Sequence, residues 1–104
     1  MDRMKPLPLI DSTIKGLIMT WRVIVRFSLN SDNTSALRNS VAALLQANGI
    51  NRTTTGTWES AAIPQAQAAQ CISSVLTQLA NPTAVTGVNP VAHLDHVWVY
   101  MDAA

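Results

Sequence analysis

The sequence predicts an α+β domain in which two helices cover one face of a small antiparallel sheet. Three observations carry this prediction: strand-like segments near both ends of the chain, two segments of helical periodicity between them, and a threonine-rich stretch that separates the helices. The 104 residues suffice for one such domain. Hydrophobic residues make up 48% of the chain and charged residues 12%, which excludes intrinsic disorder. A single cysteine excludes a disulfide-stapled module.

The first strand is expected over residues 21–29, WRVIVRFSL, because β-branched and aromatic residues alternate there with a period of two. One face of this strand carries Trp21, Val23, Val25, Phe27 and Leu29. The other face carries Arg22, Ile24, Arg26 and Ser28. The more apolar set is expected to face the helices.

The first helix is expected over residues 34–48, with Gly49 just after its end. Its apolar stripe consists of Leu37, Val41, Leu44 and Leu45. The threonine-rich stretch over 50–60 follows, where Gly56 allows either a bulge in one strand or a turn between two. A hairpin is the favoured interpretation.

The second helix is expected over residues 64–80, where Pro64 suits the first turn and Asn81-Pro82 ends it. Its buried stripe is expected to consist of Ala69, Ile72, Val75, Leu76 and Leu79. Cys71 lies beside that stripe as an unreactive small residue. A last strand over 94–102 completes a ferredoxin-like βαββαβ order, or βαβαβ if the threonine-rich stretch is one strand.

Residues 1–19 are expected to form an arm that precedes the domain over residues 20–104. Asp11 and Lys15 interrupt its apolar stretch, so neither a signal peptide nor a membrane span is predicted, and a cytoplasmic protein without a membrane partner is expected. A short helix after residues 11–13 would place Ile14, Leu17 and Ile18 on one side.

In a sheet with helices on one face only, the other face stays open. If Val97, Val99 and Met101 point toward the helices, then His96, Trp98 and Tyr100 point to the open face, beside Arg22 and Arg26. Such a surface suits either the stacking of single-stranded bases or a contact with a second copy or the arm. The formal charge of +1 favours self-association, because phosphate contacts supply most nonspecific affinity for nucleic acid.

Few residues are candidates for catalysis or metal binding. Asp32, just past the first strand, is either a metal-binding carboxylate or a cap of the first helix. His93, Asp95 and His96 are potential metal ligands, but in a regular strand His96 faces away from the other two. One of these histidines could also serve as a general base. Glu59 is expected to be solvated.

The strand WRVIVRFSL with its polar Asn30-Ser31-Asp32 step, the helix bearing Arg38 and the Thr55-Gly56-Thr57-Trp58-Glu59 segment together resemble small ferredoxin-like proteins. These are the proteins related to the CRISPR adaptation subunit and to VapD-type toxin ribonucleases. The resemblance covers about residues 20–102. It implies a homodimer associated with RNA or DNA, and a ribonuclease that uses Mg²⁺ or Mn²⁺.

The resemblance assigns roles to particular residues. Asp32 would be the catalytic, metal-binding acid, although it lies in the loop rather than within the strand. Arg22, Arg26 and Arg38 would contact phosphates. The layout is also similar to ACT-type regulatory domains, which implies a noncatalytic ligand-sensing or assembly module as the alternative; their Pro-Gly step after the first strand is missing here.

Overall fold

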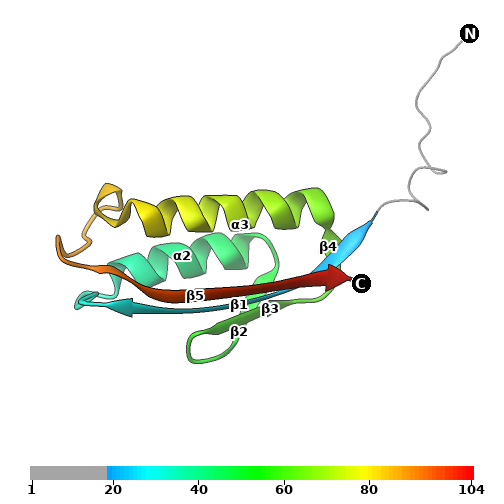
Figure 1. Ribbon diagram of the computed structural model, residues 1–104, viewed down its shortest axis with the longest axis horizontal. Coiled ribbons are helices and arrows are strands. Elements are labelled where there is room, and N and C mark those ends of the chain that lie inside the picture. Colours follow the sequence, from blue (N-terminus) through cyan, green and yellow to red (C-terminus); the bar gives the residue numbers. More distant parts are fainter. Residues whose placement is uncertain (1–18) are drawn as a thin grey trace, which may run out of the picture.

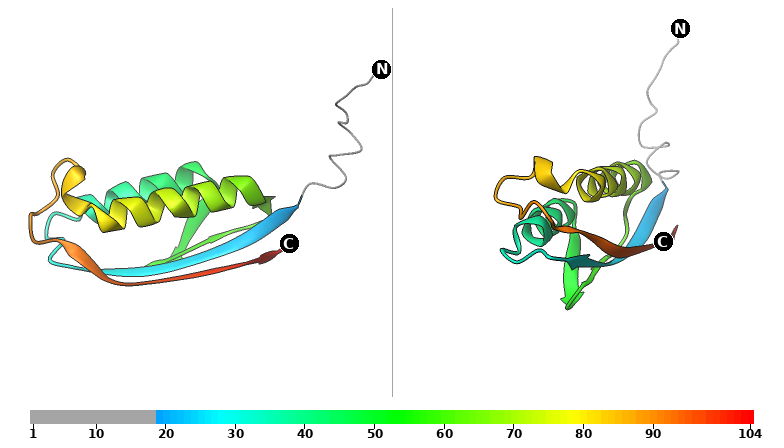
Figure 2. Two further views of the ribbon diagram at one scale, coloured as in Figure 1. Left: turned by 45° about the horizontal axis from the view of Figure 1, so that its top comes forward. Right: turned by 60° about the vertical axis from the view of Figure 1, so that its left-hand side comes forward.

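The computed structural model describes residues 19–104, and the helix predicted within the arm lies outside them. The chain forms, in order, β1 (Thr20–Asn30), α2 (Ala36–Ala47), β2 (Ile50–Thr54), β3 (Thr57–Ser60), β4 (Ile63–Pro64), α3 (Gln65–Ala80), the 3-10 helix η1 (Pro82–Ala84) and β5 (His93–Ala103). Both helices lie on the same side of the sheet and leave its other face open (Figures 1 and 2). The predicted ferredoxin-like α+β architecture is confirmed. No helix within the described residues is long and apolar enough to cross a membrane.

The five strands form one antiparallel sheet around β1. β5 pairs along one edge of β1 from Ala103 to His93, so β3 and the two-residue β4 share the other edge. β2 pairs with β3, which gives the order β2-β3-β1-β5. The threonine-rich stretch is therefore a hairpin, and Gly56 at its turn has a φ of +77° that favours glycine.

The core lies between the sheet and the two helices. Phe27 of β1 stacks on Trp58 of β3, with ring centroids 4.9 Å apart. The buried side chains are Val23, Val25, Phe27, Leu37, Val41, Leu45, Ile50, Trp58, Ala68, Cys71, Ile72, Val75 and Leu79. The predicted helix-facing set of β1 and most of the predicted stripe of α2 are thus confirmed.

The stripe predicted for α3 is partly wrong. Leu76 is 44% exposed and Ala69 is exposed, whereas Ala68 and Cys71 are buried. The buried positions 68, 71, 72, 75 and 79 follow i, i+3 and i+4 steps, so the helix is rotated by about one residue from the predicted orientation. Cys71 therefore belongs to the core, and burial raises the pKa of its thiol.

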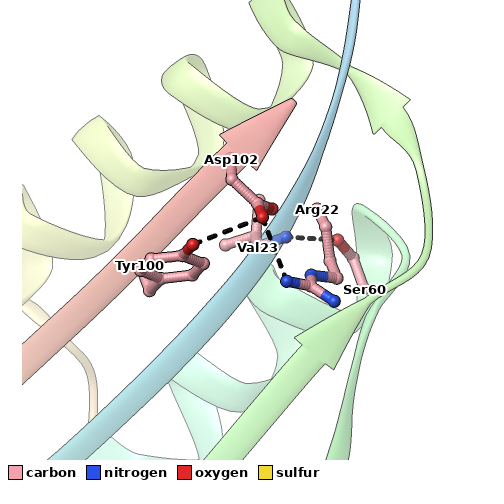
Figure 3. Close-up of polar contacts among 5 residues, drawn as sticks. All are labelled: Arg22, Val23, Ser60, Tyr100 and Asp102. Atoms are coloured by element: carbon pink, nitrogen blue, oxygen red, sulfur yellow. Dashed lines mark hydrogen bonds and ion pairs between the residues drawn. The ribbon is translucent and has the colours of Figure 1, made fainter. Parts of the chain in front are cut away.

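The sheet has a break beside β1, where β3 ends at Ser60 and β4 begins at Ile63. The N–H of Val23 faces this break and donates to the Ser60 hydroxyl at 2.9 Å (Figure 3). Ser60 is 7% exposed, so this buried hydroxyl supplies the partner that a continuous strand would otherwise provide.

Candidate functional site

The open face carries the cross-strand pairs that the alternation predicts. In the register of β1 with β5, Arg22 lies opposite Asp102, Ile24 opposite Tyr100, Arg26 opposite Trp98 and Ser28 opposite His96. The helix-facing residues of β5 are Val97, Val99 and Met101, which pair with the buried residues of β1. Met101 is nevertheless 37% exposed, because β5 is an edge strand that the helices cover only in part.

Trp98 and Tyr100 form an exposed aromatic pair on this face. The two rings are nearly parallel, with centroids 6.0 Å apart. Trp98 is 48% exposed and Tyr100 41% exposed. The guanidinium of Arg26 lies over the Trp98 ring at 5.9 Å from its centroid, a cation–π contact. We call Arg26, Trp98 and Tyr100 the aromatic platform.

A polar network flanks the aromatic platform near the end of β5 (Figure 3). Asp102 Oδ2 accepts a hydrogen bond from Arg22 at 3.0 Å and one from the Tyr100 hydroxyl at 3.3 Å. The predicted phosphate contact Arg22 is thus engaged by a carboxylate. The hydrogen bond from the Tyr100 hydroxyl to Asp102, two residues later on β5, orients the Tyr100 ring.

A second polar group lies at the other end of the platform. The register of β5 shifts between Ser28 and Leu29 of β1, so Asp95 sits at a bulge. Asp95 Oδ2 accepts from Ser28 and lies 3.2 Å from His96 Nδ1. The hydrogen bond to His96, and then that to Ser28, lower the pKa of Asp95.

This bulge changes what the sequence predicted for the histidines. In a regular strand Asp95 and His96 would point to opposite faces, but the bulge interrupts the alternation and brings His96 Nδ1 within 3.2 Å of Asp95 Oδ2. His93 instead contacts the Val91 carbonyl and Asn30. Among the residues described, no three His, Cys, Asp or Glu side chains gather as metal ligands would.

Asp32 lies at the N-terminus of α2 as a cap. Its Oδ1 accepts from the N–H of Leu37 at 3.2 Å, and its Oδ2 accepts from the N–H of Arg38 at 3.0 Å. Ser35, the residue directly before the helix, has a φ of 60° and makes no side-chain cap. The carboxylate therefore satisfies two N–H groups at the positive end of the helix dipole.

A pocket of about 330 Å³ opens beside the β2–β3 turn. Arg26 and Ser28 of β1 and His96 of β5 line it, together with Thr57 of β3 and Arg38 of α2. No carboxylate lines the pocket, although Asp95 contacts Ser28 and His96 at its rim. Arg38 was predicted as a phosphate contact, but only the folded chain brings it to the pocket that Arg26 also lines.

The hydroxyls of Ser28 and Thr57 were missed by the sequence analysis. Thr57 faces Arg26 across β1 and β3, a pairing that depends on the hairpin register. For Ser28, the alternation of β1 had placed the residue on the open face, and this was the one sequence feature that could have identified it as a site residue. No protein-family model matches this sequence, and the search of curated proteins found no match.

Proposed function

We propose that this protein binds single-stranded nucleic acid on the open face of its sheet. The observation that carries the proposal is the aromatic platform, on which Trp98 and Tyr100 stand exposed beside a guanidinium. Exposed rings beside arginine bind unpaired bases by stacking, largely without regard to sequence. The polar network at Asp102 holds one of the two rings in place.

The test is fluorescence anisotropy with a labelled single-stranded oligonucleotide. Trp98→Ala should weaken binding by about 1–3 kcal/mol, the usual contribution of one stacked base. Leu76→Ala is the matched control, because Leu76 is similarly exposed but lies on α3, away from the open face. Equal affinities for wild type and Trp98→Ala would contradict the proposal.

We propose further that two copies pair through the outer edge of β5. This 11-residue strand pairs only with β1 among the described strands, which leaves its other edge available. An antiparallel pair centred on Val99 would set Trp98 opposite Tyr100 of the second copy and His96 opposite Asp102. Such a register joins unlike rings and places the His96 imidazole opposite a carboxylate, and it would extend the platform across both copies.

Light scattering coupled to size exclusion tests the pairing. Met101→Lys should reduce the dimer fraction, because the lysine would lie opposite Val97 of the second copy in that register. Leu76→Lys is the control, since it introduces the same charge at a similarly exposed site on α3. A monomeric wild-type protein at micromolar concentration would exclude the dimer.

The second candidate function is an assembly module that binds no nucleic acid. The balanced charge favours it, because residues 19–104 contain four arginines and four carboxylates. Dimers that resist Met101→Lys but dissociate on Trp98→Ala, without any oligonucleotide binding, would support this candidate. In that case the open face is itself the interface.

Ribonuclease activity at Asp32 is the most specific form of the first proposal. A carboxylate that accepts two N–H bonds retains lone pairs for a divalent cation. Asp32→Ala should abolish cleavage of RNA in Mg²⁺ or Mn²⁺. It should also lower the free energy of unfolding by about 1 kcal/mol through loss of the cap, so both proteins are assayed where they are folded. Equal cleavage by both, or cleavage by neither, would contradict the nuclease hypothesis.

A further inference from the structure

The pocket beside the β2–β3 turn gathers the arginines that the fold leaves without side-chain partners. Within residues 19–104, Arg22 pairs with Asp102 and Arg52 donates to Thr55. The side chains of Arg26 and Arg38 make no hydrogen bond or ion pair to another described residue, apart from the contact of Arg26 with the Trp98 ring. Both of these arginines line the same pocket.

The other polar groups of the pocket are also suited to an anion. The hydroxyls of Ser28 and Thr57 can donate, and Ser28 and His96 lie opposite one another in the register of β1 with β5. Because His96 Nδ1 lies against Asp95, its Nε2 is the nitrogen left for another partner. Two guanidinium groups near hydroxyl donors form the arrangement that proteins use for phosphate.

We infer that this pocket binds the phosphate group of a nucleotide whose base stacks on Trp98. Arg26 connects the two parts, because its guanidinium lies over the Trp98 ring and the residue is also among those that line the pocket. A volume of about 330 Å³ admits a phosphate with part of its sugar. The inference rests on the proposed function, since it names the nucleotide position at which a bound strand would be held.

The substitution that isolates the pocket is Arg38→Gln. Arg38 comes from α2 and is not part of the aromatic platform, so the change leaves Trp98 and Tyr100 in place. Leu76→Glu is the charge control, because it lowers the net charge by the same one unit at an exposed site on α3, outside the pocket and away from the open face. Thermal unfolding of both variants shows whether each remains folded.

Isothermal titration calorimetry then compares four probes: inorganic phosphate, adenosine monophosphate, adenosine, and a short single-stranded oligonucleotide. Arg38→Gln should weaken binding of the monophosphate by about tenfold or more, the effect of losing one charge-assisted hydrogen bond. Binding of adenosine should be unchanged in this variant. Leu76→Glu should leave the affinity for the monophosphate at the wild-type value.

The outcomes separate this inference from the proposed function. Arg38-dependent binding of phosphate or the monophosphate without oligonucleotide binding would support the pocket as a site for free phosphate compounds and overturn the proposed function. Oligonucleotide binding that depends on Arg38 would assign the phosphate to the strand. Wild-type affinity of Arg38→Gln for every probe would overturn the pocket inference, even if Trp98 still binds bases.

Discussion

At the scale of single residues, several polar side chains complete the hydrogen bonding of the backbone. Ser60 satisfies the Val23 N–H at the break in the sheet, and Asp32 satisfies two N–H groups of α2. Both act on backbone groups that the local chain leaves without partners. The Ser60 hydroxyl and the Asp32 carboxylate therefore stabilise the fold, whatever other role either group has.

Ser60→Ala should lower the free energy of unfolding by about 1–3 kcal/mol, because it leaves the buried Val23 N–H without an acceptor. Ser73→Ala is a suitable control, since Ser73 is exposed on α3. Urea unfolding of both variants measures the difference. A loss at Ser60 no larger than that at Ser73 would mean that water replaces the hydroxyl at the break.

The contacts of Asp95 predict how its titration responds to substitution. His96 makes the larger contribution to its lowered pKa and Ser28 the smaller one. His96→Ala should therefore raise the pKa of Asp95 toward its usual value of 3.8 more than Ser28→Ala does. Because the folded-state pKa is the lower one, this interaction stabilises the fold above the unfolded-state pKa and is lost as the pH falls through the folded-state pKa. NMR titration of the carboxyl carbon measures both shifts.

At the scale of elements, the rotation of α3 decides which apolar residues are available at the surface. Leu79 is 5% exposed in the core, whereas Leu76 is 44% exposed, although both fit an apolar stripe in the sequence. Periodicity identifies the helix but leaves its rotation about the axis uncertain when apolar residues occupy adjacent positions. Packing against α2 and β1 selects the orientation that is observed.

Alanine substitutions test this orientation. Leu79→Ala should lower the free energy of unfolding by about 2–5 kcal/mol through lost burial and a cavity. Leu76→Ala should change it by about 0.5 kcal/mol or less, as is usual for exposed positions. Chemical denaturation of the two variants provides the comparison. Equal losses would place Leu76 in the core, as the sequence analysis expected.

At the scale of the whole molecule, charge is balanced overall but unevenly placed. Asp102 engages Arg22 and Asp32 caps a helix, and neither carboxylate lines the pocket. Arg26 and Arg38 are left facing one pocket. A near-neutral domain can therefore hold one or two phosphates locally without a broad basic surface.

This distribution predicts a shallow salt dependence of oligonucleotide binding. With two phosphates held by Arg26 and Arg38, the slope of log K against log[salt] should be about −1.4 for a single strand, or 0.7 per phosphate. Anisotropy titrations at several salt concentrations measure it. A slope several times steeper would mean that the strand follows a basic path outside the pocket.

Alternation and periodicity in the sequence were enough to predict the α+β class, the order of the main strands and helices, the inward face of β1 and the grouping of His96, Trp98 and Tyr100 with the arginines. These properties follow from alternation and periodicity, which are local. The sequence also left open whether Asp32 caps a helix or binds a metal. In the structure its carboxylate accepts hydrogen bonds from the N–H groups of Leu37 and Arg38 and so caps α2.

Four features became visible only in the folded chain: the rotation of α3, the bulge at Asp95, the hydrogen bond of Ser60 to Val23, and the pocket that both Arg26 and Arg38 line. Each depends on where segments far apart in the chain come together. Arg38 reaches the pocket because α2 lies on the helix-covered side of the sheet (Figure 2), and Thr57 does so through the hairpin register. The periodicity of side chains along one segment does not predict how far that segment lies from another. Strand register and the packing of the core set those distances in the folded protein.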